Sequence, residues 1–390
     1  KFFETLSSTL LDSLLRRTSL KTGRRTALTA ATEEVQTTEI EPFRTLETNP
    51  PNHVTSHLNR IYTMPSDIEN LVRDNMTNEW KKQRTVFAEC GILIRKPAIE
   101  TISYMEQADY TKSINKYVLY GINGVGKTTT LMHLLHYGFA RKFIVLHLPW
   151  VNTWFRFPKE IADSVFMPGK LDLPIHAGLL LKYFKNSNAS LLSQLDLKVT
   201  KDYTWSQRES TKCGDPLLDL VEFGIQRIKF ACGVIDVLVN ELKAASTAGK
   251  CRMLVVIDGF NALTADRTSI RDDNKVYVPA ERISLTASLF NSVDFNWCNG
   301  AAILTVDTKA TKDKRDSEYP RYLLGKKGFE YLDPFLPISV ENYTPDEFVA
   351  IMEYYKDRKW IRDITPAGQR ELELLSNRNP FHTWNYCSPL

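Results

Sequence analysis

The amino-acid sequence predicts an α/β fold in which a parallel β-sheet is covered by helices on both faces. Three observations lead to this prediction. Short apolar runs typical of buried strands recur along the chain, helix-forming segments separate them, and a glycine-rich motif directly follows the first strong strand. Strands that alternate with helices favour crossover connections, which make neighbouring strands parallel. The 390 residues suffice for a large core and about two or three structural units.

The first 30 residues carry the excess positive charge of the chain. They contain six basic residues against two acidic ones, which equals the net charge of +4 of the whole sequence. Leu6, Leu10 and Leu14 recur at helical spacing among Ser, Thr and Arg, a composition typical of mitochondrial targeting segments. Such an arm also suits a membrane surface, a polyanion such as RNA, or local packing as a tail, and these alternatives stay open.

Residues 31–60 are polar and contain Pro50 and Pro51, so we predict an extended linker. His53 and His57 are four residues apart and supply only half of a metal site. We therefore interpret them as ordinary surface histidines.

From Pro65 onward, helices and strands are predicted in turn. The segment from Pro65 to about Met105 is mainly helical, with a break near Pro97. Apolar runs predict buried strands over 117–120, 143–148, 253–257, 301–306 and 336–340. A helix over 129–139 follows the first of these strands. Pro216 opens a long helix whose apolar positions recur as far as Leu238.

The segment after the first strand carries the strongest chemical signal. Gly121-Ile122-Asn123-Gly124-Val125-Gly126-Lys127-Thr128 matches the pattern GxxxxGK[ST], between a strand and a helix as this P-loop motif requires. The backbone N–H groups of such a loop bind phosphate at a helix N-terminus. Lys127 then reaches the β and γ phosphates, Thr128 binds Mg²⁺ and Thr129 donates to the α phosphate. We assign nucleotide binding to Gly121, Asn123, Gly124, Val125, Gly126, Lys127, Thr128 and Thr129.

A P-loop needs an acid for its metal, and a hydrophobic strand that ends in Asp258 provides one. We expect this strand beside the P-loop strand, with Thr128 and Asp258 as Mg²⁺ ligands. Many P-loop ATPases carry Glu after this Asp, whereas Gly259 stands here, so slow or absent hydrolysis is expected. Asn261 and Thr305 are candidate catalytic residues for orienting water and sensing the γ phosphate, with capping or strand-end roles equally open. The candidate charge stabilisers are Arg267, Arg315 and Arg321.

Other features limit the classes of function. No run of eighteen apolar residues is present, so no membrane span is predicted. The six cysteines are scattered without a CxxC pair, which argues against a zinc site or a disulfide framework. The guanine-reading motif Asn-Lys-x-Asp is echoed only by Asn274-Lys275-Val276-Tyr277, which lacks the Asp. Sequence motifs alone therefore favour ATP.

Several further segments are specific beyond a generic P-loop: Phe43–Glu47, Ile94–Ala98, Trp205–Thr211, Asp258–Leu263, Leu323–Phe329, Asn342-Tyr343 and Leu375–Pro380. Together with the P-loop, they resemble the death-associated protein 3 family, P-loop proteins of the mitochondrial small ribosomal subunit. The resemblance covers nearly the whole chain from about Phe43. It implies a P-loop NTPase fold similar to AAA+ and STAND proteins, with a C-terminal helical lid and an extended N-terminal arm.

The resemblance also implies a division of the chain and a set of ligands. The arm and linker occupy 1–60, the nucleotide-binding core 61–344 and the helical lid 345–390. GTP or GDP with Mg²⁺ is the implied cofactor, despite the absent guanine motif. The implied location is the mitochondrial matrix, in the head of the small ribosomal subunit, with rRNA and neighbouring ribosomal proteins as partners. By position, the residues that lie where related folds hold the base are Arg95, Lys96, Asn342 and Tyr343.

Two classes of function remain open. In the first, the chain is a ribosomal structural protein whose nucleotide is a cofactor of the fold, hydrolysed slowly or not at all. In the second, it is a GTPase or ATPase switch that acts in mitochondrial translation or apoptosis signalling. Gly259 favours the first class. A small-molecule kinase would share the P-loop but needs an acceptor pocket, which the sequence does not reveal, so enzymatic activity stays undecided here.

Overall fold

The computed structural model describes residues 42–390, except for 74–75, 273, 313–315, 363 and 389–390. The predicted basic arm over 1–30, the first part of the predicted linker and the candidate Arg315 lie outside these residues. Within the described part of the chain, no helix is long and apolar enough to cross a membrane. All six cysteines are free thiols.

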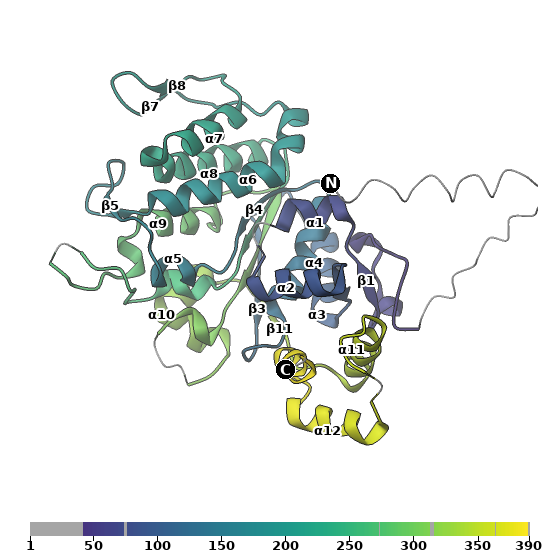
Figure 1. Ribbon diagram of the computed structural model, residues 1–390. Coiled ribbons are helices and arrows are strands. Elements are labelled where there is room, and N and C mark those ends of the chain that lie inside the picture. Colours follow the sequence, from purple (N-terminus) through teal and green to yellow (C-terminus); the bar gives the residue numbers. More distant parts are fainter. Residues whose placement is uncertain (1–41, 74–75, 273, 313–315, 363, 389–390) are drawn as a thin grey trace, which may run out of the picture. The chain divides into compact units, whose positions relative to one another are not determined.

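A five-stranded sheet lies at the centre of the fold (Figure 1). Its strands run parallel in the order β11-β3-β10-β9-β4. Their bounds are β3 Asn115–Tyr120, β4 Ile144–Leu148, β9 Met253–Ile257, β10 Gly300–Thr305 and β11 Leu336–Ser339. The predicted parallel sheet is confirmed. The expected neighbour of the P-loop strand is wrong, however, because β10 lies between β3 and β9. Chain order does not determine lateral order in a parallel sheet, since each crossover can pass over a strand.

Helices cover both faces of the sheet, as predicted. Val118 on β3 belongs to the core under helices α6 Pro174–Leu195, α7 Leu217–Gln226, α8 Ala231–Thr247 and α9 Ser284–Ser292. Its neighbours Tyr117 and Leu119 face the opposite core, under α3 Lys96–Gln107 and α4 Lys127–Ala140. The sequence pattern does not predict helix α6, because polar residues interrupt the spacing of its apolar residues. One of them, Asn188, bonds both the N–H and the carbonyl of Val145, which satisfies part of the edge of the outer strand β4.

Two helical predictions need correction. The segment from Pro65 to Met105 breaks at strand β2, Gly91–Leu93, rather than near Pro97. Pro97 instead lies in the first turn of α3, where its missing N–H has no helical partner to lose. The long helix after Pro216 is two helices, α7 and α8, because Arg227 has the non-helical angles φ −109° and ψ 67°. The apolar periodicity continues across this break, so the sequence pattern alone does not reveal it.

The described part of the predicted linker packs against the P-loop helix α4. It contains two short 3-10 helices, Pro50–Asn52 and Thr55–His57. His53 is buried, with its Nδ1 2.9 Å from Nε2 of His133 on α4, so its interpretation as a surface histidine is wrong. Beside this pair, the hydroxyl of Tyr62 lies 3.2 Å from Nδ1 of His136. Burial lowers the pKa of His136 to about 4, so this cluster is held neutral.

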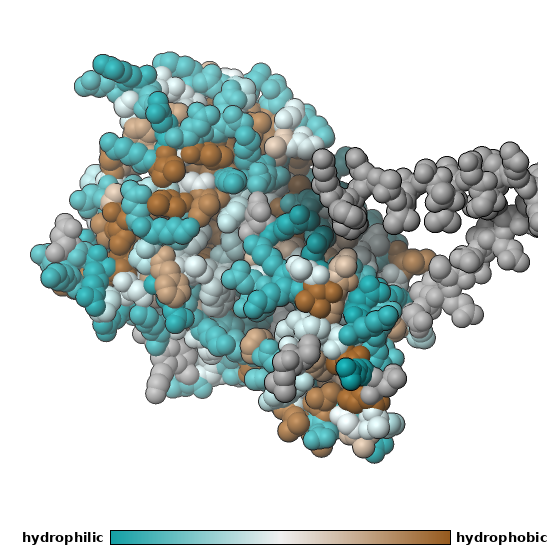
Figure 2. All heavy atoms as spheres, viewed as in Figure 1, coloured by the Kyte–Doolittle hydropathy of each residue, from teal (hydrophilic) through white to brown (hydrophobic). Residues whose placement is uncertain are grey.

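Three C-terminal helices form the lid: α11 Pro345–Asp357, α12 Pro366–Ser376 and α13 Pro380–Cys387. Their core is shared with strand β1 Ile61–Thr63, with β2 and with helix α2 Asn78–Phe87, which follows α1 Ser66–Val72. Phe87 meets Tyr354 and Trp384 edge-on. Figure 2 shows apolar side chains exposed on the lid. Leu374 and Leu375 of α12 are 81% and 61% exposed. The division of the chain at 60 and 344 stays a prediction.

Candidate nucleotide-binding site

The predicted P-loop connects β3 to α4 at the carboxyl edge of the sheet. Gly121, Gly124 and Gly126 have φ angles of 144°, 85° and 92°, which residues with a side chain rarely adopt. A Cβ at Gly121 would also lie 2.1 Å from the carbonyl oxygen of Val340. Helix α4 begins directly after the loop. Its first N–H groups have no partners within the helix, so they are free to donate to a phosphate.

Lys127, the first residue of α4, is buried and fully paired. Its Nζ donates to the carbonyl oxygens of Gly121 at 2.7 Å and Ile122 at 2.9 Å. It also lies 2.8 Å from Oδ2 of Asp307. A buried ammonium is costly unless it is paired, and these three oxygens supply the pairing. The loop therefore holds the predicted phosphate-binding cation beside an acid.

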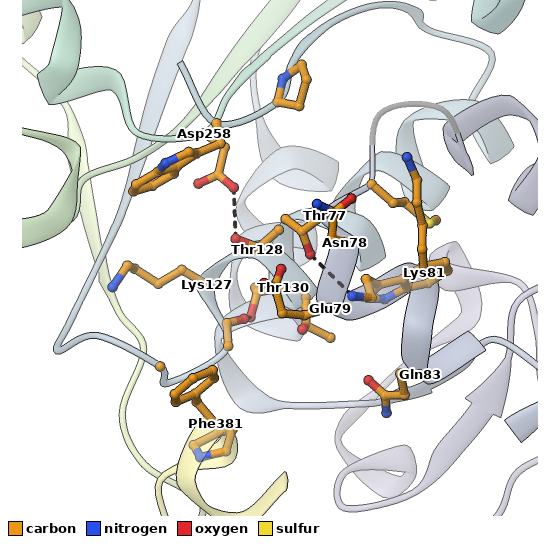
Figure 3. A pocket seen from close by; sticks show the side chains of 18 of the residues that line it. Thr77, Asn78, Glu79, Lys81, Gln83, Lys127, Thr128, Thr130, Asp258 and Phe381 are labelled. Carbon is orange, nitrogen blue, oxygen red and sulfur yellow. Dashed lines mark hydrogen bonds between the residues drawn. The ribbon is translucent and has the colours of Figure 1, made fainter. Parts of the chain in front are cut away.

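Thr128 and Asp258, the predicted Mg²⁺ ligands, are in contact. Thr128 Oγ1 donates to Oδ2 of Asp258 at 2.8 Å (Figure 3). Thr305 Oγ1 donates to Oδ1 of the same carboxylate at 2.5 Å and accepts a bond from the N–H of Gly259 at 2.7 Å. Burial raises the pKa of Asp258, against the opposing effect of the two hydroxyl donors and Lys127. Thr305 thus orients Asp258, which the position of β10 between β3 and β9 makes possible.

Asn261 does not point a free amide into the site. It is buried, its Nδ2 donates to the carbonyl of Asp307 at 2.9 Å, and its Oδ1 accepts from the N–H of Asp307 at 3.1 Å. Both polar groups therefore hold the segment that follows β10. Sequence reasoning misses Asp307 itself. The sequence offers one clue to Asp307, because this acid follows strand β10 closely, as Asp258 follows β9.

Arg95 joins the P-loop to the lid. Its Nη1 donates to the carbonyl of Val125 at 2.8 Å, and its Nη2 donates to the carbonyl of Glu341 at 2.9 Å. Nη2 also forms an ion pair with Glu347 of α11 at 3.0 Å. The ring of Tyr343 lies 5.0 Å from the guanidinium carbon. Arg95 and Tyr343 both line the cleft described below, but the donors of Arg95 are largely engaged with protein oxygens.

The lid also contacts the P-loop through Asn379, at the start of α13. Its Nδ2 donates to the carbonyl of Asn123 at 3.1 Å, and the N–H of Phe381 donates to the carbonyl of Gly124 at 3.1 Å. The same Nδ2 donates to Oδ1 of Asn342 at 3.1 Å, so Asn342 is a link between lid segments. Sequence reasoning misses the contacts of Asn379. Its signal is Asn followed by Pro, which is typical of a helix N-cap.

A cleft of about 900 Å³ extends from the P-loop (Figure 3). Lys127, Thr128 and Asp258 lie on one side of it, and Thr77 and Asn78, at the start of α2, lie on the other. Aromatic side chains line it at several points, among them Trp80, Trp150, Tyr343, Tyr354, Phe381 and Trp384. The size and the apolar lining with a few converging polar groups are those of a small-molecule site.

The remaining candidates lie elsewhere. Lys96 is exposed at the start of α3 and does not line the cleft. Arg267 is exposed, with its guanidinium carbon 4.1 Å from the ring centroid of Tyr277, and Arg321 is exposed on helix α10, Pro320–Leu332. Two cations that do line the cleft, Arg156 and Lys159, belong to no sequence motif, so only the structure reveals them.

A family profile described as mitochondrial ribosomal death-associated protein 3 matches residues 92–383. The chain belongs to this family. It is 36% identical over 352 residues to the small ribosomal subunit protein mS29 of Bos taurus, covering 89% of this chain and 88% of that protein. Identity to the Mus musculus protein of the same name is 34%, covering 89% of each. The family and the mitochondrial location expected from the sequence are confirmed.

Solved structures align more loosely. The Walker-type ATPase of Pyrococcus abyssi has a TM-score of 0.37 and 13% identity, covering 75% of this chain and 65% of that one. The ORC2 protein of Aeropyrum pernix in its ADP form has a TM-score of 0.38 and 14% identity, covering 78% and 64%. The α/β P-loop fold follows from the order of the strands and the geometry of the loop between β3 and α4.

Proposed function

We propose that this chain is a structural component of the mitochondrial small ribosomal subunit whose P-loop binds a guanine nucleotide with Mg²⁺ and hydrolyses it slowly or not at all. The mammalian relatives support the ribosomal role in this proposal, because they are named as proteins of the small subunit and their alignments cover 89% of this chain. The partners that follow are the rRNA of that subunit, in its head, and neighbouring ribosomal proteins.

The donor set of the loop supports the nucleotide part of the proposal. The hydroxyl of Thr128 and the carboxylate of Asp258 meet at 2.8 Å and supply the hard oxygen ligands that Mg²⁺ prefers. Lys127 and the first N–H groups of α4 would hold the phosphates. Bound Mg²⁺ would neutralise phosphate charge beside these residues. The choice of guanine rests on the family resemblance, since aromatic rings such as Trp80 can stack on either purine.

Slow hydrolysis is supported by the residue after Asp258. Gly259 carries no carboxylate, and the amide of Asn261 is bonded to the backbone of Asp307, so neither provides a base for the attacking water.

The test is phosphate release from GTP with Mg²⁺ by the purified chain, with Lys127→Ala as the background control. We expect multiple turnover far below about 1 per second, the lower end of ordinary enzymes. Intact small subunits extracted in parallel should release one bound guanine nucleotide for each copy of the chain. Turnover near that rate without an added partner would overturn the structural role of the nucleotide.

The second candidate function, an active GTPase or ATPase switch in translation or apoptosis signalling, is favoured by Asp307. This buried carboxylate lies 2.8 Å from Nζ of Lys127, so an acid is present in the site after all. If Asp307 acts as the base, Asp307→Asn abolishes phosphate release and keeps nucleotide binding. If the nucleotide is a cofactor of the fold, Asp307→Asn and the wild type release phosphate at the same slow rate.

A further inference from the structure

Helix α10 is kinked at Gly325, the first residue of the segment Gly325-Lys326-Lys327-Gly328. Gly325 has φ 63° and ψ −177°, which breaks the helix, and no atom lies within 4 Å of the position that a Cβ would take there. At Gly328, by contrast, a Cβ would lie 2.8 Å from a methyl group of Thr264. One glycine is thus open to solvent and the other is packed tightly. Two consecutive lysines lie at the surface between these glycines, in the helical segment that follows the kink.

These lysines are almost fully exposed and loosely paired. The side chains of Lys326 and Lys327 are 86% and 78% exposed. Their nearest acids in these pairs, Glu330 and Glu281, lie at 4.0 Å and 3.8 Å and are themselves exposed. Such pairs contribute little to stability and are readily exchanged for another anion. The two ammonium groups are therefore exposed beside the open backbone of Gly325, and they can exchange their carboxylate partners for another anion.

Aromatic and basic side chains continue this surface along the first half of α10. Tyr319 and Tyr322 are 54% and 48% exposed, and Arg321 between them is exposed as well. Tyrosine rings offer a face on which a base can stack, and the cations offer partners for phosphates.

We propose that the surface made by Tyr319, Arg321, Tyr322, Lys326 and Lys327 binds single-stranded RNA. Lys326 and Lys327 contact successive backbone phosphates, the open Gly325 lets the strand approach, and Tyr322 stacks on a base. A Gly-x-x-Gly segment also contacts the RNA backbone in KH modules. The inference rests on the proposed ribosomal role and names the surface that would meet RNA.

The surface is also connected to the nucleotide site. Gly328 packs on Thr264, which ends the 3-10 helix Phe260–Thr264 that begins two residues after Asp258. Tyr319 packs on Tyr120, the last residue before the P-loop, with ring centroids 5.7 Å apart. Segments that border the nucleotide site therefore also contact the proposed RNA surface.

The experiment measures binding of a fluorescein-labelled single-stranded uridine oligonucleotide to the full chain by fluorescence anisotropy over a range of salt concentrations. Any contribution of the basic arm to RNA binding is the same in every variant. The variants are therefore compared by the slope of log K against log salt. Lys326→Ala/Lys327→Ala should reduce the slope of log K against log salt by about 1.4, or two contacts at about 0.7 each. The control Lys201→Ala/Lys250→Ala removes the same charge from exposed positions elsewhere and should leave the slope unchanged.

Tyr322→Ala separates stacking from charge. Loss of one stacked base should weaken binding roughly fivefold or more at every salt concentration, with the slope unchanged. Equal slopes for the wild type and the Lys326/Lys327 variant would overturn the proposal, and so would an equal loss in the control. Loss of binding to anionic lipid vesicles without loss of RNA binding would assign the surface to a membrane and overturn it too. Thermal shifts with GTP, measured on the same proteins, test the nucleotide proposal independently.

Discussion

Lys127 is a buried cation that contacts both its own P-loop and the segment that follows β10. Two carbonyl oxygens of its own loop accept from it, and Asp307 faces it from the end of β10 at 2.8 Å. Removing one member of a buried ion pair leaves the other without a partner. Substitution of Lys127 therefore has two effects, one on nucleotide binding and one on the chain without nucleotide.

We expect Lys127→Ala to lower nucleotide affinity by roughly 30-fold to 150-fold, because a charge-assisted contact contributes about 2–3 kcal/mol. The same variant should unfold at a lower temperature without nucleotide, since Asp307 loses its cation. Lys127→Ala/Asp307→Asn should recover the stability but not the affinity. Equilibrium binding of fluorescent GTP and thermal melting measure the two effects. Affinity within about threefold of the wild type would show that Lys127 does not contact the phosphates.

Sequence reasoning identifies the site residues that belong to one local motif. It misses those that the fold brings to the site from distant parts of the chain. Lys127 and Thr128 belong to a local pattern, so spacing alone identifies them. Asp307 becomes part of the site only because β10 lies between β3 and β9. Asn379 reaches the loop from 256 residues away, through the folding of the lid. Contacts that depend on lateral strand order and on lid docking leave no local signal in a single sequence.

Because of the buried histidines, we expect the free energy of unfolding to decrease in acid. Burial lowers the pKa of His136 from 6.5 to about 4, so the unfolded chain binds this proton at a higher pH than the folded chain. Stability is therefore lost as pH falls from about 6.5 towards 4. At pH 5 the loss attributable to His136 amounts to about 2 kcal/mol.

His136→Gln removes the titrating group while keeping a polar partner for the hydroxyl of Tyr62. The variant should lose about 2 kcal/mol less stability than the wild type between pH 7.5 and pH 5. Urea unfolding at each pH measures the difference. Parallel pH profiles for the two proteins would contradict the assignment and place the acid sensitivity in other groups.

At the scale of elements, strands are predicted better than helices. Strands β9 and β10 are buried along their whole length, so each reads as an apolar run that the sequence shows directly. Helix boundaries are set by tertiary contacts that periodicity does not show. Arg227 divides α7 from α8 although the apolar spacing continues, and Asn188 interrupts the spacing of α6 because it bonds the edge strand β4.

The lid is held on the P-loop by the cap of its last helix. Asn379 is buried, accepts bonds from the N–H groups of Phe381 and His382, and donates to the carbonyl of Asn123. We expect Asn379→Ala to destabilise the chain by about 2 kcal/mol, from the lost N-cap and the lost bond to the loop. Nucleotide should also dissociate faster, because the lid separates from the loop more often.

Asn385→Ala is the matched control for this prediction, since Asn385 is exposed on the same helix. Stopped-flow dissociation of fluorescent nucleotide, together with urea unfolding, compares the two variants. If both leave the dissociation rate at the wild-type value, the contact between α13 and the P-loop plays no part in holding nucleotide.

At the scale of the whole molecule, the cleft is assembled from parts that are distant in sequence. The P-loop and Asp258 come from the sheet, Thr77 and Asn78 from the N-terminal helices, and Phe381 from the lid. Arg95 connects these parts, because it bonds the P-loop, the segment that follows β11 and the first lid helix at once. A ligand that fills the cleft adds further links among the same parts, so it should stabilise the fold as a unit.

Bound nucleotide should raise the melting temperature of the chain. A ligand that binds only the folded chain raises its stability by RT ln(1 + [L]/Kd), or about 4 kcal/mol at a thousandfold excess over Kd. Melting of the purified chain should therefore shift upward by several degrees with GTP or GDP and Mg²⁺. Asp258→Ala should lose the part of the shift that depends on Mg²⁺, because Asp258 is the acid that meets Thr128 at 2.8 Å. Thr130→Val changes a hydroxyl that bonds the carbonyl of Gly126 instead, so this control should keep the Mg²⁺-dependent shift. A melting temperature indifferent to nucleotide would refute the role of the nucleotide as a cofactor of this fold.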